Sequence, residues 1–190
     1  MNSSIEAIDF CSDKLRFYKD WCFSTMINSI PTELECSSDW QNGIVVKERI
    51  DSGSRSVGLN LSRNEAIEHS KNLTQPIFQP MIKGRELSAE TWIDQNGKSH
   101  GVLLRWRMEV VNGESHHTST FHDARLSGEL IKIFEQIPGL RGHCLPQLMI
   151  QSEDSPWIIE INPRLGGASP IAPHAGMESI LWFLLEGCGR

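Results

Sequence analysis

Apolar and polar residues alternate along this chain with two different periods, which predicts helices and strands in mixed order. Apolar side chains recur at helical spacing over residues 13–29 and 123–137, and an apolar stretch at 171–185 predicts a final helix. The tetrapeptide SRNE at 62–65 has the pattern of a capping box and predicts a helix to about residue 73. Short β-branched or alternating runs predict strands at 43–49, 57–61, 76–82, 86–94, 99–111, 115–121, 145–150 and 157–161.

Hairpins, rather than long helical crossovers, join most of the predicted strands. The dipeptide Asn96-Gly97 indicates a tight turn between two strands, and the polar segment at 152–155 indicates another. Strands in hairpins with interspersed helices favour the α+β fold class. A length of 190 residues is typical of one domain, which we expect to span residues 1–190.

Composition and charge narrow the functional classes. The net charge is −6 and the basic residues form no block, so we expect no nucleic-acid partner. The longest strongly apolar run, residues 180–185, is far shorter than the ~20 residues that span a bilayer, and residues 1–10 lack the pattern of a signal peptide. The five cysteines form no CxxC pair, which is typical of reduced thiols in a cytoplasmic protein.

A lysine followed by a small-residue loop is the first candidate for chemistry. Lys47 ends a predicted strand, and the loop at 51–56 reads DSGSRS. Glycine and small hydroxylated residues allow backbone N–H groups to approach a phosphate closely, and a lysine adds a point charge. The alternative is a mobile hairpin loop with an exposed lysine, and the sequence leaves both interpretations open.

The second candidate is the run EINPR at the end of the last predicted strand. Glu160 and Asn162 are two residues apart, so a strand directs both side chains to one face. A carboxylate and an amide oxygen suit Mg²⁺, Gln147 on the neighbouring strand could add a third oxygen, and Arg164 could hold a phosphoryl group. The alternative is an ordinary strand end at an Asn-Pro turn with a surface arginine.

Two arginines on one strand form the third candidate. Arg105 and Arg107 share a face and could clamp a phosphate or carboxylate, or could lie on a solvated sheet face. The adjacent His116 and His117 would point to opposite faces of a strand, so they cannot share one metal ion.

Together and in this order, these motifs resemble the ATP-grasp superfamily, in particular the branch similar to carbamoyl-phosphate synthase large-subunit domains. The resemblance covers about residues 12–187. It is carried by DK at 13–14, IVVK at 44–47, FQPMIKGRE at 78–86, RWR at 105–107, GHCLPQ at 142–147 and IIEINPRLGG at 158–167.

The resemblance implies ATP bound between two α+β lobes with mainly antiparallel sheets, about 1–85 and 86–190, together with Mg²⁺ or Mn²⁺. It implies that Lys47 and Arg164 are catalytic and that Glu86 contacts the ribose. The phosphates would meet Lys47, Ser52, Gly53, Ser54 and Arg55, and the adenine would meet Gln79, the Pro80 carbonyl, Met81 and the Ile82 N–H. The metal would be held by Gln147, Glu160 and Asn162, and the substrate by Arg105, Arg107 and Ser169.

The function implied is an ADP-forming ligase that joins a small-molecule carboxylate to an amine or other nucleophile through an acyl phosphate. The alternatives are an ATP-binding module or half of a split enzyme, and an ATP-grasp kinase. Glu48 follows Lys47 where proline is common, which places a carboxylate near the phosphates unless Arg49 or Arg55 neutralises it. Relatives usually carry a Rossmann-like domain before this one, so we expect a homo-oligomer or a separate protein that supplies that domain.

Overall fold

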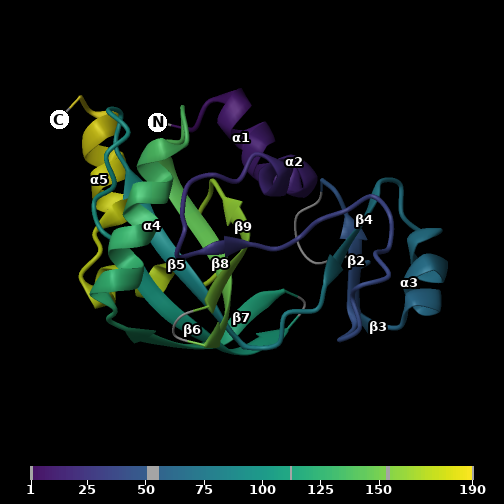
Figure 1. Ribbon diagram of the computed structural model, residues 1–190. Coiled ribbons are helices and arrows are strands. Elements are labelled where there is room, and N and C mark those ends of the chain that lie inside the picture. The colour runs from purple at the N-terminus through teal and green to yellow at the C-terminus, as the bar shows by residue number, and fades with distance from the viewer. Residues whose placement is uncertain (1, 51–55, 112, 153–154, 190) are drawn as a thin grey trace.

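Two sheets of unequal size organise the computed structural model, which describes residues 2–50, 56–111, 113–152 and 155–189 (Figure 1). Within these residues the larger sheet has the strand order β1-β9-β8-β5-β6-β7, and the smaller has the order β3-β2-β4. The elements are α1 (Ile5–Ser12), α2 (Lys14–Lys19), β1 (Asn28–Ser29), β2 (Ile44–Glu48), β3 (Gly58–Leu61), α3 (Arg63–Ser70), β4 (Pro76–Pro80), β5 (Arg85–Ile93), β6 (Leu103–Val111), β7 (Glu114–Phe121), α4 (Ala124–Gln136), β8 (Gly142–Ser152), β9 (Ser155–Asn162) and α5 (Ser179–Gly187).

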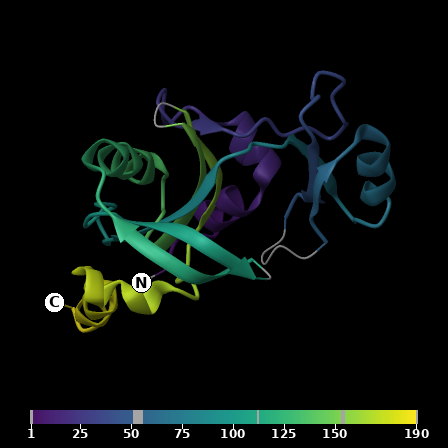
Figure 2. The ribbon, with the colours of Figure 1, turned by 90° about the horizontal axis from the view of Figure 1, so that it is seen from below.

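The larger sheet separates an apolar face from a polar one. All its pairs are antiparallel except β1 with β9. Because side chains alternate along a strand, Leu87 and Ala89 of β5 face the core, whereas Glu86, Ser88 and Glu90 share the opposite face. Figure 2 shows α4 and α5 on opposite sides of this sheet. Helix α5 covers part of the polar face, where Phe183 contacts Trp92 of β5, and Glu86 at the start of β5 lines a cavity beyond it.

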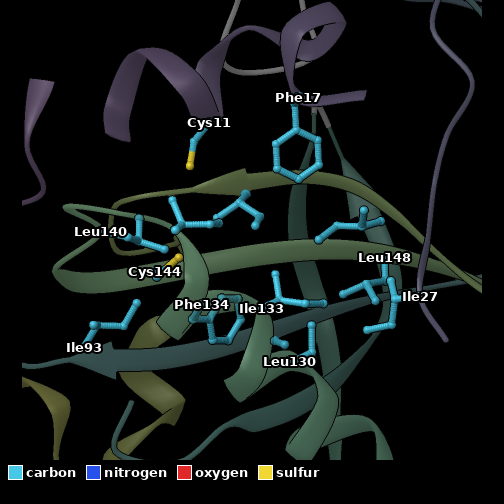
Figure 3. Packing of buried hydrophobic residues seen from close by; sticks show 14 of the residues in the cluster. Cys11, Phe17, Ile27, Ile93, Leu130, Ile133, Phe134, Leu140, Cys144 and Leu148 are labelled. Carbon is cyan, nitrogen blue, oxygen red and sulfur yellow. The ribbon is translucent and has the colours of Figure 1, made fainter. Parts of the chain in front are cut away.

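Helices α1, α2 and α4 bury the apolar face. Figure 3 shows Cys11 and Phe17 from the first two helices and Leu130, Ile133 and Phe134 from α4 around the strands of the sheet. The stripe on α4 has the helical spacing expected from the sequence, and Asp123 caps it by accepting from the Leu126 N–H.

The smaller sheet and α3 form a separate lobe, on the right in Figure 1. Its own core contains Ile44, Val46 and Phe78 against Ala66 of α3. The predicted capping box is confirmed, because the Ser62 hydroxyl accepts from the Glu65 N–H and the Glu65 carboxylate accepts from the Ser62 N–H.

The first thirty residues differ from the expected lobe division. We placed residues 1–85 in one lobe, but α1, α2 and Ile27 belong to the core of the larger sheet, and β1 extends its edge. The lobe built on the smaller sheet begins only after this segment, and Cys36 is the first buried residue of its core along the chain.

Two predicted helices are shorter than expected. The helix expected over 13–29 ends at Lys19, and the Ser24 hydroxyl accepts from the N–H groups of Met26 and Ile27 in a turn that leads into β1. The helix expected over 171–185 begins only at Ser179, because Pro173 and Gly176, with φ at +85°, interrupt it. No helix among the described residues is long and apolar enough to cross a bilayer.

Candidate functional site

A cavity of about 570 Å³ lies where the polar face of the larger sheet meets the smaller lobe. This volume is typical of sites for small molecules and cofactors. Its walls come from both lobes. The larger sheet and the segments packed on it contribute Lys14, Ile30, Glu86, Arg107, Val110, Gly113, Gln147, Met149, Ile159 and Glu160, and the smaller lobe with the residues just after β4 contributes Val45, Lys47, Glu48, Val57, Leu59, Gln79, Pro80, Met81 and Ile82. Nine of the predicted site residues therefore meet here: Lys47, Gln79, Pro80, Met81, Ile82, Glu86, Arg107, Gln147 and Glu160.

Two buried lysines line the cavity and give it a local positive charge. Lys47 lies on β2 and Lys14 opens α2, and both are more than nine-tenths buried. Burial is the largest influence and lowers the pKa of Lys47, the Glu160 carboxylate raises it, and the neighbouring Lys14 lowers it, which together leave the pKa at about 8. Lys47 is therefore still mainly an ammonium ion at neutral pH, in a setting that favours an incoming anion.

The Glu48 carboxylate binds backbone N–H groups of the segment before β4. Its carboxylate accepts from the backbone N–H groups of Thr74 at 2.6 Å and Gln75 at 2.8 Å, and these bonds lower its pKa. The expected neutralisation by Arg49 is wrong, because the Arg49 Nε donates to Asp13 Oδ1 at 2.8 Å. The carboxylate after Lys47 is thus compensated by backbone donors.

Glu86 and Arg107 form an ion pair on the cavity wall. The Arg107 Nε lies 3.1 Å from Glu86 Oε1, and the guanidinium also donates to the Gly113 carbonyl at 2.7 Å. Burial raises the pKa of Glu86, the arginine lowers it, and Glu160 raises it. Arg107 therefore orients the Glu86 carboxylate within the cavity and favours its ionised form.

The oxygen donors predicted for a metal lie side by side. The register of β8 and β9 places Gln147 opposite Glu160, and the Asn162 Nδ2 donates to Glu160 Oε1 at 2.7 Å. The Asn162 amide thus contacts the Glu160 carboxylate through its NH₂ group, and Asn162 itself is not among the residues that line the cavity. One carboxylate and two amide oxygens fit Mg²⁺, which takes few protein ligands and completes its shell with water and phosphate.

The outer edge of β4 leads into the connection between the lobes. On the outer edge of β4, Phe78 exchanges backbone hydrogen bonds with Glu33 at 2.9 and 3.0 Å. Because alternate residues direct their backbone groups to the same edge, the Pro80 carbonyl continues this edge, and the Ile82 N–H follows it. Within the described chain, no backbone hydrogen bond uses the Ile82 N–H. The cavity therefore has an acceptor and a donor beside each other.

Arg105 and Ser169 lie apart from these groups, in a buried network with Glu90 in which Glu90 Oε1 and Arg105 Nε have no hydrogen-bond partner among the described residues. The Arg105 guanidinium and the Ser169 hydroxyl both donate to Glu90 Oε2, at 3.2 and 2.8 Å. All three are at most 3% exposed, so the solvated face considered for Arg105 is wrong. Burial raises the pKa of Glu90 and lowers that of Arg105, and each partner opposes this effect. The network fastens the loop after β9 to the sheet.

The structure does not bring Arg164 to the cavity, and it does not describe the loop expected to contact the phosphates. Arg164 is exposed, its guanidinium donates to the Leu165 carbonyl at 3.1 Å, and it does not line the cavity. Ser52, Gly53, Ser54 and Arg55 lie outside the described residues, although Val57 and Leu59 just beyond them do line the cavity.

Sequence reasoning missed three groups that the fold brings to these sites. Lys14 enters the sequence analysis only within the DK motif at 13–14, although it lines the cavity. Met149 lies two residues after Gln147, so strand alternation could have indicated it. Glu90 lies four residues after Glu86, and the same rule could have placed it on the same face of β5.

The comparisons with known proteins agree with this geometry. A family model described as the ATP-grasp domain matches residues 11–168. A search of curated proteins found no match.

Solved structures of similar fold include several enzymes. A biotin carboxylase from Campylobacter jejuni, in complex with a form of ATP, has a TM-score of 0.73 at 15% identity over 94% of this chain and 46% of its own. The D-alanine–D-alanine ligase of Bacillus anthracis complexed with ATP has a TM-score of 0.66 at 14% identity, and the match covers 94% of this chain and 65% of the ligase. An L-amino acid ligase from Bacillus licheniformis has a TM-score of 0.64 at 18% identity, and the match covers 86% of this chain and 43% of that ligase. The chain thus spans less than two thirds of each, and these likenesses confirm the predicted fold.

Proposed function

Because the chain belongs to the ATP-grasp family, we propose that its inter-lobe cavity binds ATP with Mg²⁺ and uses it to activate a carboxylate. One observation carries the proposal: the opposed pair Gln147 and Glu160 lies across the same cavity from the buried Lys47. Oxygen donors for a cation and an ammonium group for phosphates are the parts that phosphoryl transfer requires.

In this proposal, different residues of the cavity bind the adenine, the ribose and the phosphates. The backbone edge at Pro80 and Ile82 would accept the adenine, Glu86 held by Arg107 would accept the ribose hydroxyls, and Lys14 and Lys47 would neutralise the phosphates. Gln147, Glu160 and Asn162 would hold Mg²⁺, which supplies charge stabilisation at the transferred phosphoryl group.

The reaction needs no protein nucleophile. A substrate carboxylate oxygen attacks the γ-phosphorus of ATP, the bond to the bridging oxygen breaks and ADP leaves. An amine then attacks the acyl carbon of the acyl phosphate, the bond from that carbon to oxygen breaks, and inorganic phosphate leaves with the electron pair and takes up the proton that the amine nitrogen loses. The protein contributes position and charge, for which the described lining residues supply lysines, an arginine and glutamates.

A second candidate is a nucleotide-binding module that acts only with a partner, either another copy or a separate protein. It is favoured by the exposed position of Arg164, which leaves the described cavity without the arginine expected at the transferred phosphate. A partner that packs against the loop after β9 could turn the Arg164 side chain toward the site.

Three assays separate these functions. Calorimetry with ATP and Mg²⁺ tests the site, an ADP-release screen over carboxylates and amines tests turnover, and hydroxylamine traps an acyl phosphate as a hydroxamate. A hydroxamate supports the ligase, whereas ADP release without one indicates a kinase. ATP binding without turnover supports the module, and no ATP binding contradicts both proposals.

Nucleotide affinity should fall as the pH rises above neutrality. Lys47 has a pKa of about 8, so it loses its charge between pH 7 and pH 9. Bound phosphates favour the ammonium form, so we expect Mg·ATP affinity to fall about tenfold over this interval. Lys47→Arg keeps its charge and should flatten the profile, as calorimetry at fixed ionic strength can measure. A wild-type profile as flat as that of Lys47→Arg would contradict the assignment.

Glu86 should matter more for ATP than the side chains beside it. Glu86→Ala removes a charged acceptor for the ribose, a bond worth about 1.5–3 kcal/mol, or roughly ten- to a hundredfold in affinity. Ile82→Val changes a side chain while leaving the backbone N–H, and it should bind ATP nearly as the parent does. Equal affinities of Glu86→Ala and the parent would show that the ribose lies elsewhere.

A further inference from the structure

The side-chain amide of Gln79 is held in one orientation at the cavity wall. Its Nε2 donates to the Thr32 Oγ1 at 2.8 Å, and the Thr32 hydroxyl donates to the Ile30 carbonyl at 2.9 Å. Gln79 is 4% exposed and Thr32 is 1% exposed, so neither bond competes with bulk water. Thr32 lies between β1 and β2, in the segment that joins the two lobes.

The chemistry of these groups decides which end of the amide faces Thr32. A carbonyl oxygen can only accept, so the single hydroxyl proton of Thr32 must point to Ile30. The threonine oxygen can then only accept, which selects the NH₂ end of Gln79. The Gln79 Oε1 is left as an acceptor, and within the described chain no hydrogen bond uses it. Because Gln79 lines the cavity, this acceptor is available to a ligand there.

We propose that Thr32 is a positioning residue that makes the cavity select adenine over 6-oxopurines. The inference rests on the proposed ATP site. Adenine carries a 6-amino donor that an acceptor at Gln79 would bind, whereas hypoxanthine and guanine carry a 6-oxo acceptor that the same atom repels. The Pro80 carbonyl lies one residue along β4 and adds a second acceptor on the same wall.

The test compares ATP with ITP, because hypoxanthine lacks the 2-amino group of guanine and so tests the edge at positions 1 and 6. Thr32→Val removes the hydroxyl, so the Gln79 amide can rotate and present Nε2 to the 6-oxo group. We expect the ratio of the ITP and ATP dissociation constants to fall about tenfold, through weaker ATP binding and stronger ITP binding. Thr32→Ser keeps the hydroxyl and should keep the ratio within about twofold of the parent.

A double-mutant cycle shows whether Thr32 acts through Gln79. Gln79→Met removes the amide, so adding Thr32→Val to it should leave the ratio unchanged. Gln79→Glu offers only acceptors, cannot present a donor when ionised and should keep the preference for ATP even if Thr32→Val folds poorly.

The outcomes separate this inference from the proposed function. A parent that binds ATP and ITP equally, or a Thr32→Val variant that weakens both nucleotides alike, would overturn the role of Thr32 and leave the ATP site standing. A fall of the ratio in Gln79→Glu would overturn it as well. A parent that binds neither nucleotide would overturn the ATP site and this inference with it.

Discussion

Replacing Glu160 with glutamine should weaken Mg·ATP binding by about a hundredfold or more and leave the fold intact. Glu160 is the carboxylate of the proposed metal site, with Gln147 opposite and Asn162 bonded to it. Altering groups that merely orient a metal ligand typically costs ten- to a hundredfold, so loss of the charged ligand itself should cost at least as much. Calorimetry with Mg·ATP and thermal melting of the free protein measure the two effects.

The metal dependence of this effect identifies its cause. Glu160→Gln also removes a negative charge that faces the phosphates, so affinity for ATP in EDTA should stay equal or rise. Glu68→Gln is the matched control, because Glu68 is an exposed carboxylate on α3 paired with Lys71. If Glu160→Gln bound Mg·ATP as tightly as Glu68→Gln, the metal site would have to lie elsewhere.

Replacing Arg105 with methionine should lower the free energy of unfolding by about 3–5 kcal/mol. The change leaves Glu90 buried without its counter-charge, while the Ser169 hydroxyl alone cannot compensate it. For a chain of this size the loss corresponds to roughly 6–20 °C in melting temperature. Urea unfolding at neutral pH measures it directly.

Two controls isolate the buried charge. Arg16→Met breaks an exposed pair with Asp20 on α2 and should cost less than about 1 kcal/mol. The double variant Glu90→Leu/Arg105→Met removes both charges and should recover much of the loss. Equal melting temperatures for Arg105→Met and Arg16→Met would show that the buried network does not stabilise the fold.

The loss in Arg105→Met should depend on pH in a defined direction. Burial already raises the pKa of Glu90 in the folded protein, and removing the arginine raises it further. The folded state then binds more protons than the unfolded state, so stability falls as the pH rises from the ordinary glutamate value to the raised one. The destabilisation should therefore be largest at neutral pH and decrease toward pH 5.

Most strands could be predicted because their signals are local. The β-branched run at β2, the hairpin signal before β6 and the alternation in β5 depend on neighbouring residues alone, and the structure forms strands at these places. The helix expected over 13–29 failed because apolar spacing does not report that Ser24 would fold into a turn and bond to Glu129 on a distant helix. Tertiary contacts therefore overrode local propensity at that segment.

The sequence alone determined the order of the motifs, and with it the α+β class and the family. It also determined that Glu160 and Asn162 share a face, since strand geometry fixes that relation within three residues. It could not decide which charges meet across elements. Arg105 and Arg107 are equivalent by spacing, yet one pairs with the buried Glu90 and the other with Glu86 in the cavity. The orientation of Gln79 likewise depends on Thr32, 47 residues away. Only the tertiary structure settles such pairs, because burial and partner geometry depend on the packing of segments that are distant in the chain.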